Sequence, residues 1–377
     1  MTSKERMIAA MNNQEPDMVP VAPDMSNMIP CRLTGKPFWD IYLFQEIPLW
    51  KAYINAVKHF GFDGWLPAVP VEFDYEREWR LSRPQWAEAI VLRTPERIYT
   101  RMHATIDGKM QWSNTANVYY IDNPPTLNVS LEQIELTPAA PTDYEDVVRK
   151  TTYEGLSAFH EAKRLMGEDG VVGISAWLPG ISVKESNVYE YYDDKISFIE
   201  RCDKIRESQV KRTKAILEAK PDFLFLGQSG HMIMNPEPIF RDLSLNTLKD
   251  VTRLASEAGI PSQVHCCGPE YEFVKIAANE SELSSINPLE IPPMGDCDLS
   301  AVKKEFGSQI SLMGNIHTTD VMLRGSVDDV KRECRKAMDD AATGGGFILS
   351  TGDQCGRDTP DENIYAMIET ARIHGTY

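Results

Sequence analysis

The chain has 377 residues, with 39 Lys and Arg against 56 Asp and Glu, and its formal net charge is −17. This acidic balance argues against a nucleic-acid-binding protein, which needs a basic face, and against docking on anionic lipid. The seven cysteines are an odd number in a long chain, which argues against a disulfide framework and leaves thiols free to bind metal.

The first residues predict a short helix and no targeting segment. Met7, Ile8 and Met11 recur at helical spacing behind a Thr2 or Ser3 cap. Residues 1–17 lack the apolar core of a signal peptide, and no later run approaches the length of a membrane span. The sequence therefore predicts a cytoplasmic protein.

Eight short apolar runs recur along the chain and predict the strands of a parallel sheet. Their hydrophobicity is mostly continuous, as expected for strands covered on both faces. Amphipathic segments such as 248–260 and 327–342 separate them and predict helices. Eight such units in this length predict an α/β fold of the (β/α)₈, or TIM-barrel, type. The runs are 19–25, 62–68, 171–178, 223–229, 261–267, 284–291, 309–316 and 347–354.

One stretch interrupts this alternation. Residues 88–114 are rich in β-branched and aromatic side chains, and Asp107-Gly108 is a hairpin turn signal. We expect a β-rich hairpin insertion over 83–125, after the second strand. It would form a lid or wall within a single TIM-barrel domain that spans residues 1–377.

Polar side chains gather where the predicted strands end. In barrels of this type the catalytic groups project from the carboxyl ends of the strands. Few of the residues found there would be chosen to fill a core, although Trp65 and Trp177 have core or rim packing as their commoner role. The set comprises Asp24, Trp65, Trp177, Gln228, His231, His265, Cys267, Asn287, Glu290, Asn315, His317, Asp353 and Cys355.

The segment 264–268, Val-His-Cys-Cys-Gly, gives the sharpest local signal. Alternation along a strand puts His265 and Cys267 on one face, and imidazole nitrogen and thiolate sulfur are zinc ligands. The alternative is a satisfied core histidine beside small buried thiols. A catalytic zinc site needs a third protein ligand and an open position. Cys355 would supply the third ligand, or Asp353 takes this place and Cys355 does not bind.

Several motifs resemble those of uroporphyrinogen-decarboxylase-like proteins over nearly the whole chain. Within that superfamily, His265-x-Cys267 is similar to the motif of zinc-dependent, cobalamin-linked methyltransferases such as methylcobamide:coenzyme M methyltransferases. The motifs are Ser3-Lys4-Glu5-Arg6-Met7, Glu15-Pro16-Asp17 with Val19-Pro20-Val21, His265-x-Cys267-Gly268, Gly314-Asn315-Ile316 and Thr359-Pro360-x-Glu362-Asn363.

The resemblance implies a TIM barrel whose zinc is held by the His, the Cys and a second Cys after the last strand. His265 and Cys267 match this pattern directly. The second Cys of the family would stand at the position of Asp353, and the nearest sulfur here is Cys355. The expected ligand set is therefore His265, Cys267 and Cys355, with an exchange of sulfur for the Asp353 oxygen as the alternative.

The expected activity is that of a zinc-dependent methyltransferase. It would move a methyl group between a corrinoid and a small substrate such as a thiol, a folate or a methoxylated aromatic. Asp353, Glu290 and His317 are the candidates for proton transfer to a leaving group. The expected substrate-binding residues are Asp24, Trp177, Gln228, His231 and Asn315. Zn²⁺ and cobalamin are the expected cofactors, with a separate corrinoid protein as partner and a homodimer as an option.

The alternative function is a metal-independent decarboxylase of the uroporphyrinogen type. Such an enzyme is expected to carry an Arg-rich segment near the amino terminus for substrate carboxylates. After the first predicted strand, however, no arginine occurs before Arg32. A net charge of −17 also suits a multiply carboxylated substrate poorly.

Overall fold

The structure is a computed structural model that describes residues 1–25 and 27–377. The chain divides into two compact units. The first contains Met1–Asp24, Val57–Val69 and Glu161–Tyr377, and the second contains Met25–Ala56 and Pro70–His160.

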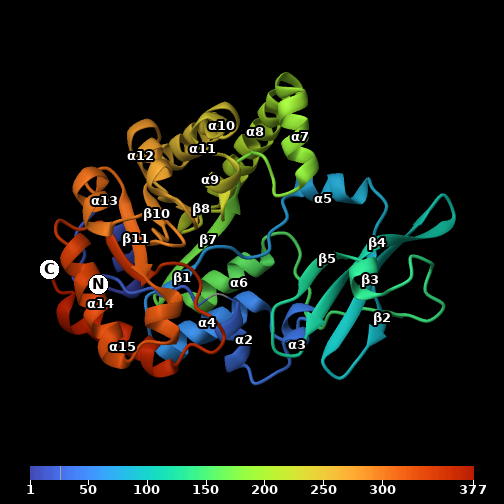
Figure 1. The fold of residues 1–377 in the computed structure, drawn as a ribbon, viewed down its shortest axis with the longest axis horizontal. Coiled ribbons are helices and arrows are strands. Elements are labelled where there is room, and N and C mark those ends of the chain that lie inside the picture. The colour runs from blue at the N-terminus through green and yellow to red at the C-terminus, as the bar shows by residue number, and fades with distance from the viewer. Residues whose placement is uncertain (26) are drawn as a thin grey trace. The chain divides into compact units, whose positions relative to one another are not determined.

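A curled sheet of seven parallel strands forms the centre of the first unit (Figure 1). Each strand overlaps one of the predicted apolar runs, so the prediction of an α/β, TIM-barrel-like fold is confirmed at this level. In sheet order the strands are β1 (Gly64–Leu66), β7 (Gly170–Ala176), β8 (Phe223–Gly227), β9 (Ser262–His265), β10 (Ser285–Asn287), β11 (Ser311–Ile316) and β12 (Phe347–Thr351).

The first predicted strand, 19–25, is wrong as a regular strand. Val21 makes only an isolated parallel bridge to Leu349 of β12, while its carbonyl oxygen accepts the Asp63 N–H at 2.9 Å. Pro20 and Pro23 have no N–H to donate, so this segment cannot continue a hydrogen-bonded ladder. It is an extended segment between β12 and the start of β1, and the sheet of the described residues has seven strands rather than eight.

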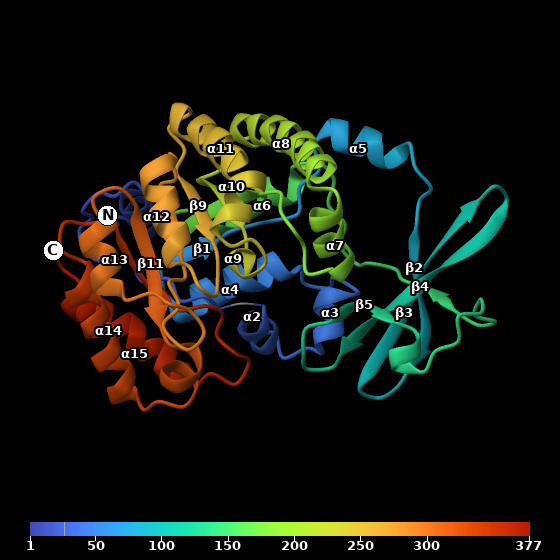
Figure 2. The same cartoon turned by 45° about the horizontal axis from the view of Figure 1, so that its top comes forward.

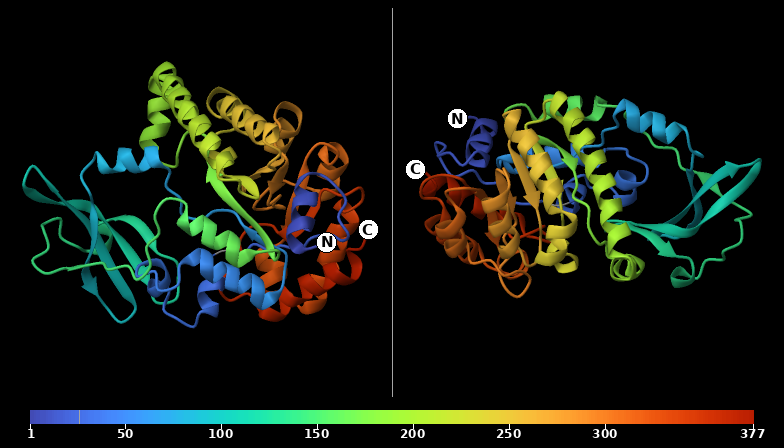
Figure 3. Two further views of the ribbon diagram at one scale, coloured as in Figure 1. Left: turned by 180° about the vertical axis from the view of Figure 1, so that it is seen from behind. Right: turned by 90° about the horizontal axis from the view of Figure 1, so that it is seen from above.

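Helices follow the strands and lie on the outside of the sheet (Figures 1 and 3). In α14, for example, Val330, Cys334, Ala337 and Met338 repeat at helical spacing and are buried. The longer helices are α4 (Leu49–Phe60), α6 (Ser157–Met166), α7 (Glu185–Asp193), α8 (Lys195–Glu218), α11 (Leu245–Glu257), α12 (Tyr271–Glu280), α13 (Leu299–Phe306), α14 (Val327–Ala341) and α15 (Asp361–His374). Two short helices, α9 (His231–Met234) and α10 (Glu237–Leu243), follow β8.

The predicted opening helix, α1 (Ser3–Met11), closes the end of the sheet at which the strands begin. Its Met7 and Met11 pack with Trp65, Phe223 and other buried side chains of the strands. Trp65 is 3% exposed, and its Nε1–H donates to Gln263 Oε1 at 2.6 Å. Trp65 is therefore a core residue whose polar atom is satisfied inside the fold.

The two ends of the chain lie close together (Figure 2). Met18 forms an antiparallel bridge with Thr376, and the Val19 N–H donates to the Gly375 carbonyl at 2.7 Å. In the described residues, no helix is both long and apolar enough to cross a membrane.

The second unit is built on a five-stranded antiparallel sheet in the order β5-β4-β3-β2-β6. Asp107 and Gly108, both at positive φ, join the two longest strands. Three further strands pair with these two, and two of them, β5 and β6, lie beyond residue 125, where the predicted insertion ends. The elements are α2 (Met28–Leu33), α3 (Phe38–Tyr42), α5 (Asp74–Leu81), β2 (Ala87–Arg93), β3 (Arg97–Ile106), β4 (Lys109–Tyr120), β5 (Thr126–Ser130) and β6 (Glu145–Asp146).

A buried carboxylate helps to hold this sheet together. Glu88 on β2 accepts hydrogen bonds from Thr100 on β3 and from Asn117 and Tyr119 on β4, and Arg149 pairs with its other oxygen at 2.8 Å. These contacts link residues up to 61 positions apart. A local pattern such as the Asp107-Gly108 turn does not reveal them.

Candidate metal centre

The end of β9 presents His265 and Cys267 on the same side of the chain. Backbone hydrogen bonds fix this segment on both sides: the Gln228 N–H donates to the His265 carbonyl at 2.7 Å, and the Cys266 N–H donates to the Asn287 carbonyl at 2.8 Å. Cys266 is fully buried and points away. Gly268 then turns the chain at φ 94°, a conformation that glycine adopts without strain.

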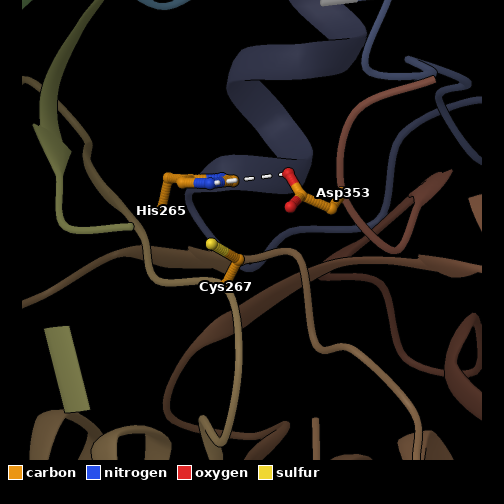
Figure 4. A group of neighbouring side chains, drawn as sticks. All are labelled: His265, Cys267 and Asp353. Carbon is orange, nitrogen blue, oxygen red and sulfur yellow. Dashed lines mark ion pairs between the residues drawn. The ribbon is translucent and has the colours of Figure 1, made fainter. Parts of the chain in front are cut away.

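Asp353, in the loop after β12, completes a group of three. The ligand atoms of His265, Cys267 and Asp353 lie within 4.8 Å of one another (Figure 4). His265 Nε2 is 3.8 Å from Asp353 Oδ1. Asp353 adopts φ 111°, and the Thr351 hydroxyl donates to its carbonyl at 2.7 Å. A non-glycine residue held in this conformation is strained, and such strain concentrates at functional sites.

The structure does not bring Cys355 into this group. Its side chain is fully buried, and its N–H donates to the Asp24 carbonyl at 2.9 Å. Burial raises the pKa of the Cys355 thiol to about 12, and the Asp24 carboxylate adds to the effect. Of the two alternatives for the third ligand, the geometry therefore favours Asp353 over Cys355. The reason is that the loop turns at Asp353 and sends Cys355 back into the core.

Asn287 at the end of β10 is positioned to fix the tautomer of His265. Its Nδ2 lies 3.2 Å from His265 Nδ1, while its Oδ1 is buried without a hydrogen-bond partner among the described residues. A half-turn of the amide would let Oδ1 accept an Nδ1–H, which would leave the Nε2 lone pair free for a metal. Metal-binding histidines usually make such a second contact. The unpartnered oxygen therefore fits a metal ligand at Nε2.

The electrostatics of the three residues also fit a cation. Burial lowers the pKa of His265, so the ring is held neutral, as a ligand must be. Burial and the neighbouring Asp353 carboxylate raise the pKa of Cys267 to about 11, and a bound cation would offset both effects and favour the thiolate. One nitrogen, one sulfur and one carboxylate oxygen form a zinc-type donor set, and three protein ligands leave a position open, as in catalytic zinc sites.

A pocket of about 330 Å³ opens beside Asp353, and we call it the Asp353 pocket. Its polar lining includes Glu290, Asn315, His317, Asp320 and Asp353. The pocket thus gathers all three predicted catalytic residues, Asp353, Glu290 and His317, together with the predicted substrate-binding residue Asn315.

Glu290 is held at the wall of this pocket by two neighbouring contacts. Its Oε2 accepts the Gly268 N–H at 2.6 Å, and burial raises its pKa. The preceding residue, Leu289, adopts φ 61° and donates its N–H to the fully buried Glu270 at 2.6 Å. Glu270 thus anchors the turn that presents Glu290.

His317 has a defined tautomer. Its Nδ1 accepts the backbone N–H of Thr319 at 3.2 Å and of Asp320 at 2.9 Å, at the start of a short π-helical turn, Thr318–Leu323. Because Nδ1 is the acceptor, the proton of the neutral ring is on Nε2. His317 therefore acts toward a ligand as a hydrogen-bond or proton donor.

The other predicted substrate-binding residues are more dispersed. Asp24 lies by Cys355, and its N–H bonds the Thr351 hydroxyl at 3.0 Å. Trp177 is 47% exposed, with Arg212 over its ring. His231 bonds Ser244 through Nε2 at 3.0 Å, and burial lowers its pKa to about 4, so its ring is held neutral within the fold. Gln228 lines a second pocket.

The sequence patterns missed two residues of this site. Asn287 lies at a predicted strand end, and its register partner on the neighbouring strand β9 is His265. Ser229 lies close enough to Cys267 to favour its thiolate. Parallel pairing of the predicted strands would have indicated Asn287. No local signal marks Ser229.

Two solved structures of known proteins resemble this chain. Over its whole length the chain resembles a solved methyltransferase from Methanosarcina mazei, with a TM-score of 0.61 and 17% identity over 99% of each chain. A B12-independent methionine synthase from a Shewanella species matches with a TM-score of 0.42 and 14% identity, over 94% of this chain and 97% of that one. No curated protein matches the sequence closely enough to count as a relative.

The first of these likenesses shows a shared fold. The family model described as uroporphyrinogen decarboxylase (URO-D) matches residues 188–374, which include β8 to β12 and therefore His265, Cys267 and Asp353. Residues 188–374 are therefore a URO-D family domain, which is consistent with the URO-D-like superfamily.

Proposed function

We propose that this protein is a zinc-dependent methyltransferase that moves a methyl group between a corrinoid, carried by a separate corrinoid protein, and a small substrate. The convergence of His265, Cys267 and Asp353 within 4.8 Å at the catalytic end of the sheet carries this proposal. The full-length likeness to a solved methyltransferase supports it.

The chain's own residues have distinct tasks in this proposal. His265, Cys267 and Asp353 hold the metal, and Asn287 orients His265. The Gly230 N–H donates to the Cys267 carbonyl at 3.2 Å and so fixes the backbone that presents the sulfur. When bound in such a site, Zn²⁺ supplies Lewis acidity that lowers the pKa of a coordinated thiol or polarises an ether or amine donor.

Proton transfer falls to the groups that line the Asp353 pocket. His317 presents Nε2–H because two backbone amides occupy its Nδ1. Burial raises the pKa of Glu290, and one of its oxygens is held by the Gly268 N–H, so the other oxygen is the one that can carry a proton. Either residue can protonate the heteroatom that leaves the methyl group.

Metal analysis tests the proposal directly. The purified protein is expected to contain one zinc per chain and to lose it in Cys267→Ser, while Cys202→Ala, a change of a buried cysteine on α8, keeps it. Methyl transfer is followed through the absorbance of cobalamin, which reports the cobalt oxidation state. Wild-type protein without stoichiometric zinc, or zinc retained in Cys267→Ser, would contradict the proposal.

The same purified protein distinguishes the decarboxylase alternative, which the description of the matching family favours. A decarboxylase would release carbon dioxide from a carboxylated substrate after the metal is removed with a chelator. The methyltransferase is expected to lose its activity under that treatment and to regain it with Zn²⁺.

His317→Asn is expected to reduce methyl transfer about tenfold, which corresponds to a barrier about 1.4 kcal/mol higher. The Asn side-chain oxygen can still accept the two backbone amides, but the outward Nε2–H is lost. The matched variant His317→Gln, which can present an N–H at a similar reach, should recover part of the rate. Equal rates for His317→Asn and wild type would show that this proton is not used.

A further inference from the structure

A second pocket is lined by residues that neighbour Cys267 of the proposed metal centre. This Gln228 pocket has a volume of about 360 Å³ and lies between the chain segments that follow β7 and β8. Its wall includes Ser229 and Gly230, and the Gly230 N–H donates to the Cys267 carbonyl at 3.2 Å. The Asp353 pocket contains Asp353 itself, so the two pockets neighbour different members of the same group.

The lining of the Gln228 pocket carries no charge in the described part of the chain. Its apolar wall includes Ile181, Val183 and Ile233, and the last two are 86% and 62% exposed. The Asn235 side chain is hydrogen-bonded to the backbone of Ile181: its Oδ1 accepts the N–H at 2.7 Å, and its Nδ2 donates to the carbonyl at 3.1 Å. His231 Nε2 is hydrogen-bonded to the Ser244 hydroxyl at 3.0 Å.

Gln228 is the exception among these polar groups. Its side chain is buried, with 6% of the residue exposed, and its backbone N–H donates to the His265 carbonyl. Its Nε2 is buried without a hydrogen-bond partner among residues 1–25 and 27–377. Buried polar side-chain atoms are almost always hydrogen-bonded, and one that is not requires an explanation. Gln228 lines the pocket, so a rotation of its side chain would bring Nε2 to an acceptor atom of a bound ligand, which would supply the missing partner.

We infer that the Gln228 pocket binds the body of the small methyl substrate, whose methyl-bearing heteroatom extends to the proposed metal centre, and that this substrate is an uncharged molecule with a hydrogen-bond acceptor on an apolar body, such as a methyl ether. The inference rests on the proposed function and narrows its substrate. An anionic thiol would find no cationic side chain in this lining, and a methylated ammonium ion would find no carboxylate, so each would lose hydration without compensation.

Ligand binding to the full chain tests this inference. Dissociation constants are measured by titration calorimetry for three probes: neutral 2-methoxyphenol, anionic 2-mercaptoethanesulfonate and cationic tetramethylammonium. Each is titrated into the metal-free protein. The variants are Gln228→Leu, which is similar in size and has no N–H, and Gln309→Ala, a control at an exposed glutamine before β11.

We expect 2-methoxyphenol to bind at least tenfold more tightly than either charged probe. Gln228→Leu should weaken its binding about five- to tenfold, while Gln309→Ala leaves it unchanged. The melting temperature of Gln228→Leu should equal or exceed that of the wild type, because only an unpaired amide is removed. The inference is overturned if no probe binds, if a charged probe binds as tightly, or if Gln228→Leu binds like the wild type.

Zinc content and methyl transfer are measured on the same preparations, so the two proposals fail separately. Protein that lacks zinc but binds 2-methoxyphenol through Gln228 would contradict the proposed function and support the assignment of the pocket as a binding site for a neutral ligand. Protein that holds zinc and transfers methyl groups, but shows no preference for the neutral probe, would remove only the pocket's assignment.

Discussion

Asp353→Gly is expected to lose zinc and at the same time to make the metal-free protein more stable. Asp353 adopts φ 111°, which costs a non-glycine residue about 1–3 kcal/mol. Glycine removes this strain but loses about 0.5–1 kcal/mol more through conformational entropy on folding. The net gain in the free energy of unfolding should be about 1 kcal/mol, measured by urea denaturation with a chelator present.

The loss of zinc affinity in Asp353→Gly should exceed 100-fold, because even outer partners of metal ligands contribute 10–100-fold. Cys355→Ser is the decisive comparison, since Cys355 is the third ligand that the family resemblance favours. It should keep its zinc, because its sulfur is buried beside Asp24 and outside the group of three. Zinc lost from Cys355→Ser but retained in Asp353→Gly would show that the loop rearranges around the metal to present the sulfur.

The pairing of His265 with Cys267 could be predicted because it depends on one local rule, the alternation of side chains along a strand. The third member could not be chosen in the same way. Asp353 and Cys355 are two residues apart on a loop, and the positive φ at Asp353 decides which of them faces the group. That angle depends on contacts with residues distant in the sequence, such as the Gly352 N–H to the Ile316 carbonyl at 2.7 Å.

The sequence patterns identified seven strands of the parallel sheet because most of these strands lie in largely apolar runs. They failed for 19–25, where Pro20 and Pro23 were a visible warning that the ladder could not form. They also failed to show the extent of the antiparallel sheet. Strand β5 lies in a proline-rich stretch that looks like a surface connection, and the buried Glu88 that joins the strands is satisfied only by distant residues.

Glu270→Gln is expected to stabilise the protein increasingly as the pH rises. Glu270 is fully buried, and burial raises its pKa well above the ordinary 4.5, with Glu290 and Asp296 adding to the effect. The folded state therefore holds this proton more tightly than the unfolded state does. Below the unfolded pKa both states are protonated and the effect is absent, whereas above it the wild-type folded state becomes progressively less stable.

Glutamine stays neutral at every pH and can still accept the Leu289 N–H that Glu270 accepts at 2.6 Å. Near pH 4 we therefore expect wild type and Glu270→Gln to unfold at similar urea concentrations. At pH 8 the variant should be more stable by about 1–3 kcal/mol, the usual cost of a buried polar group without compensation. Glu282→Gln, at an exposed position after α12, is the control and should stay within about 0.5 kcal/mol of wild type. A wild type that is the more stable protein at pH 8 would mean that the buried carboxylate is ionised and compensated, so that Glu270 holds the turn before Glu290 by its charge.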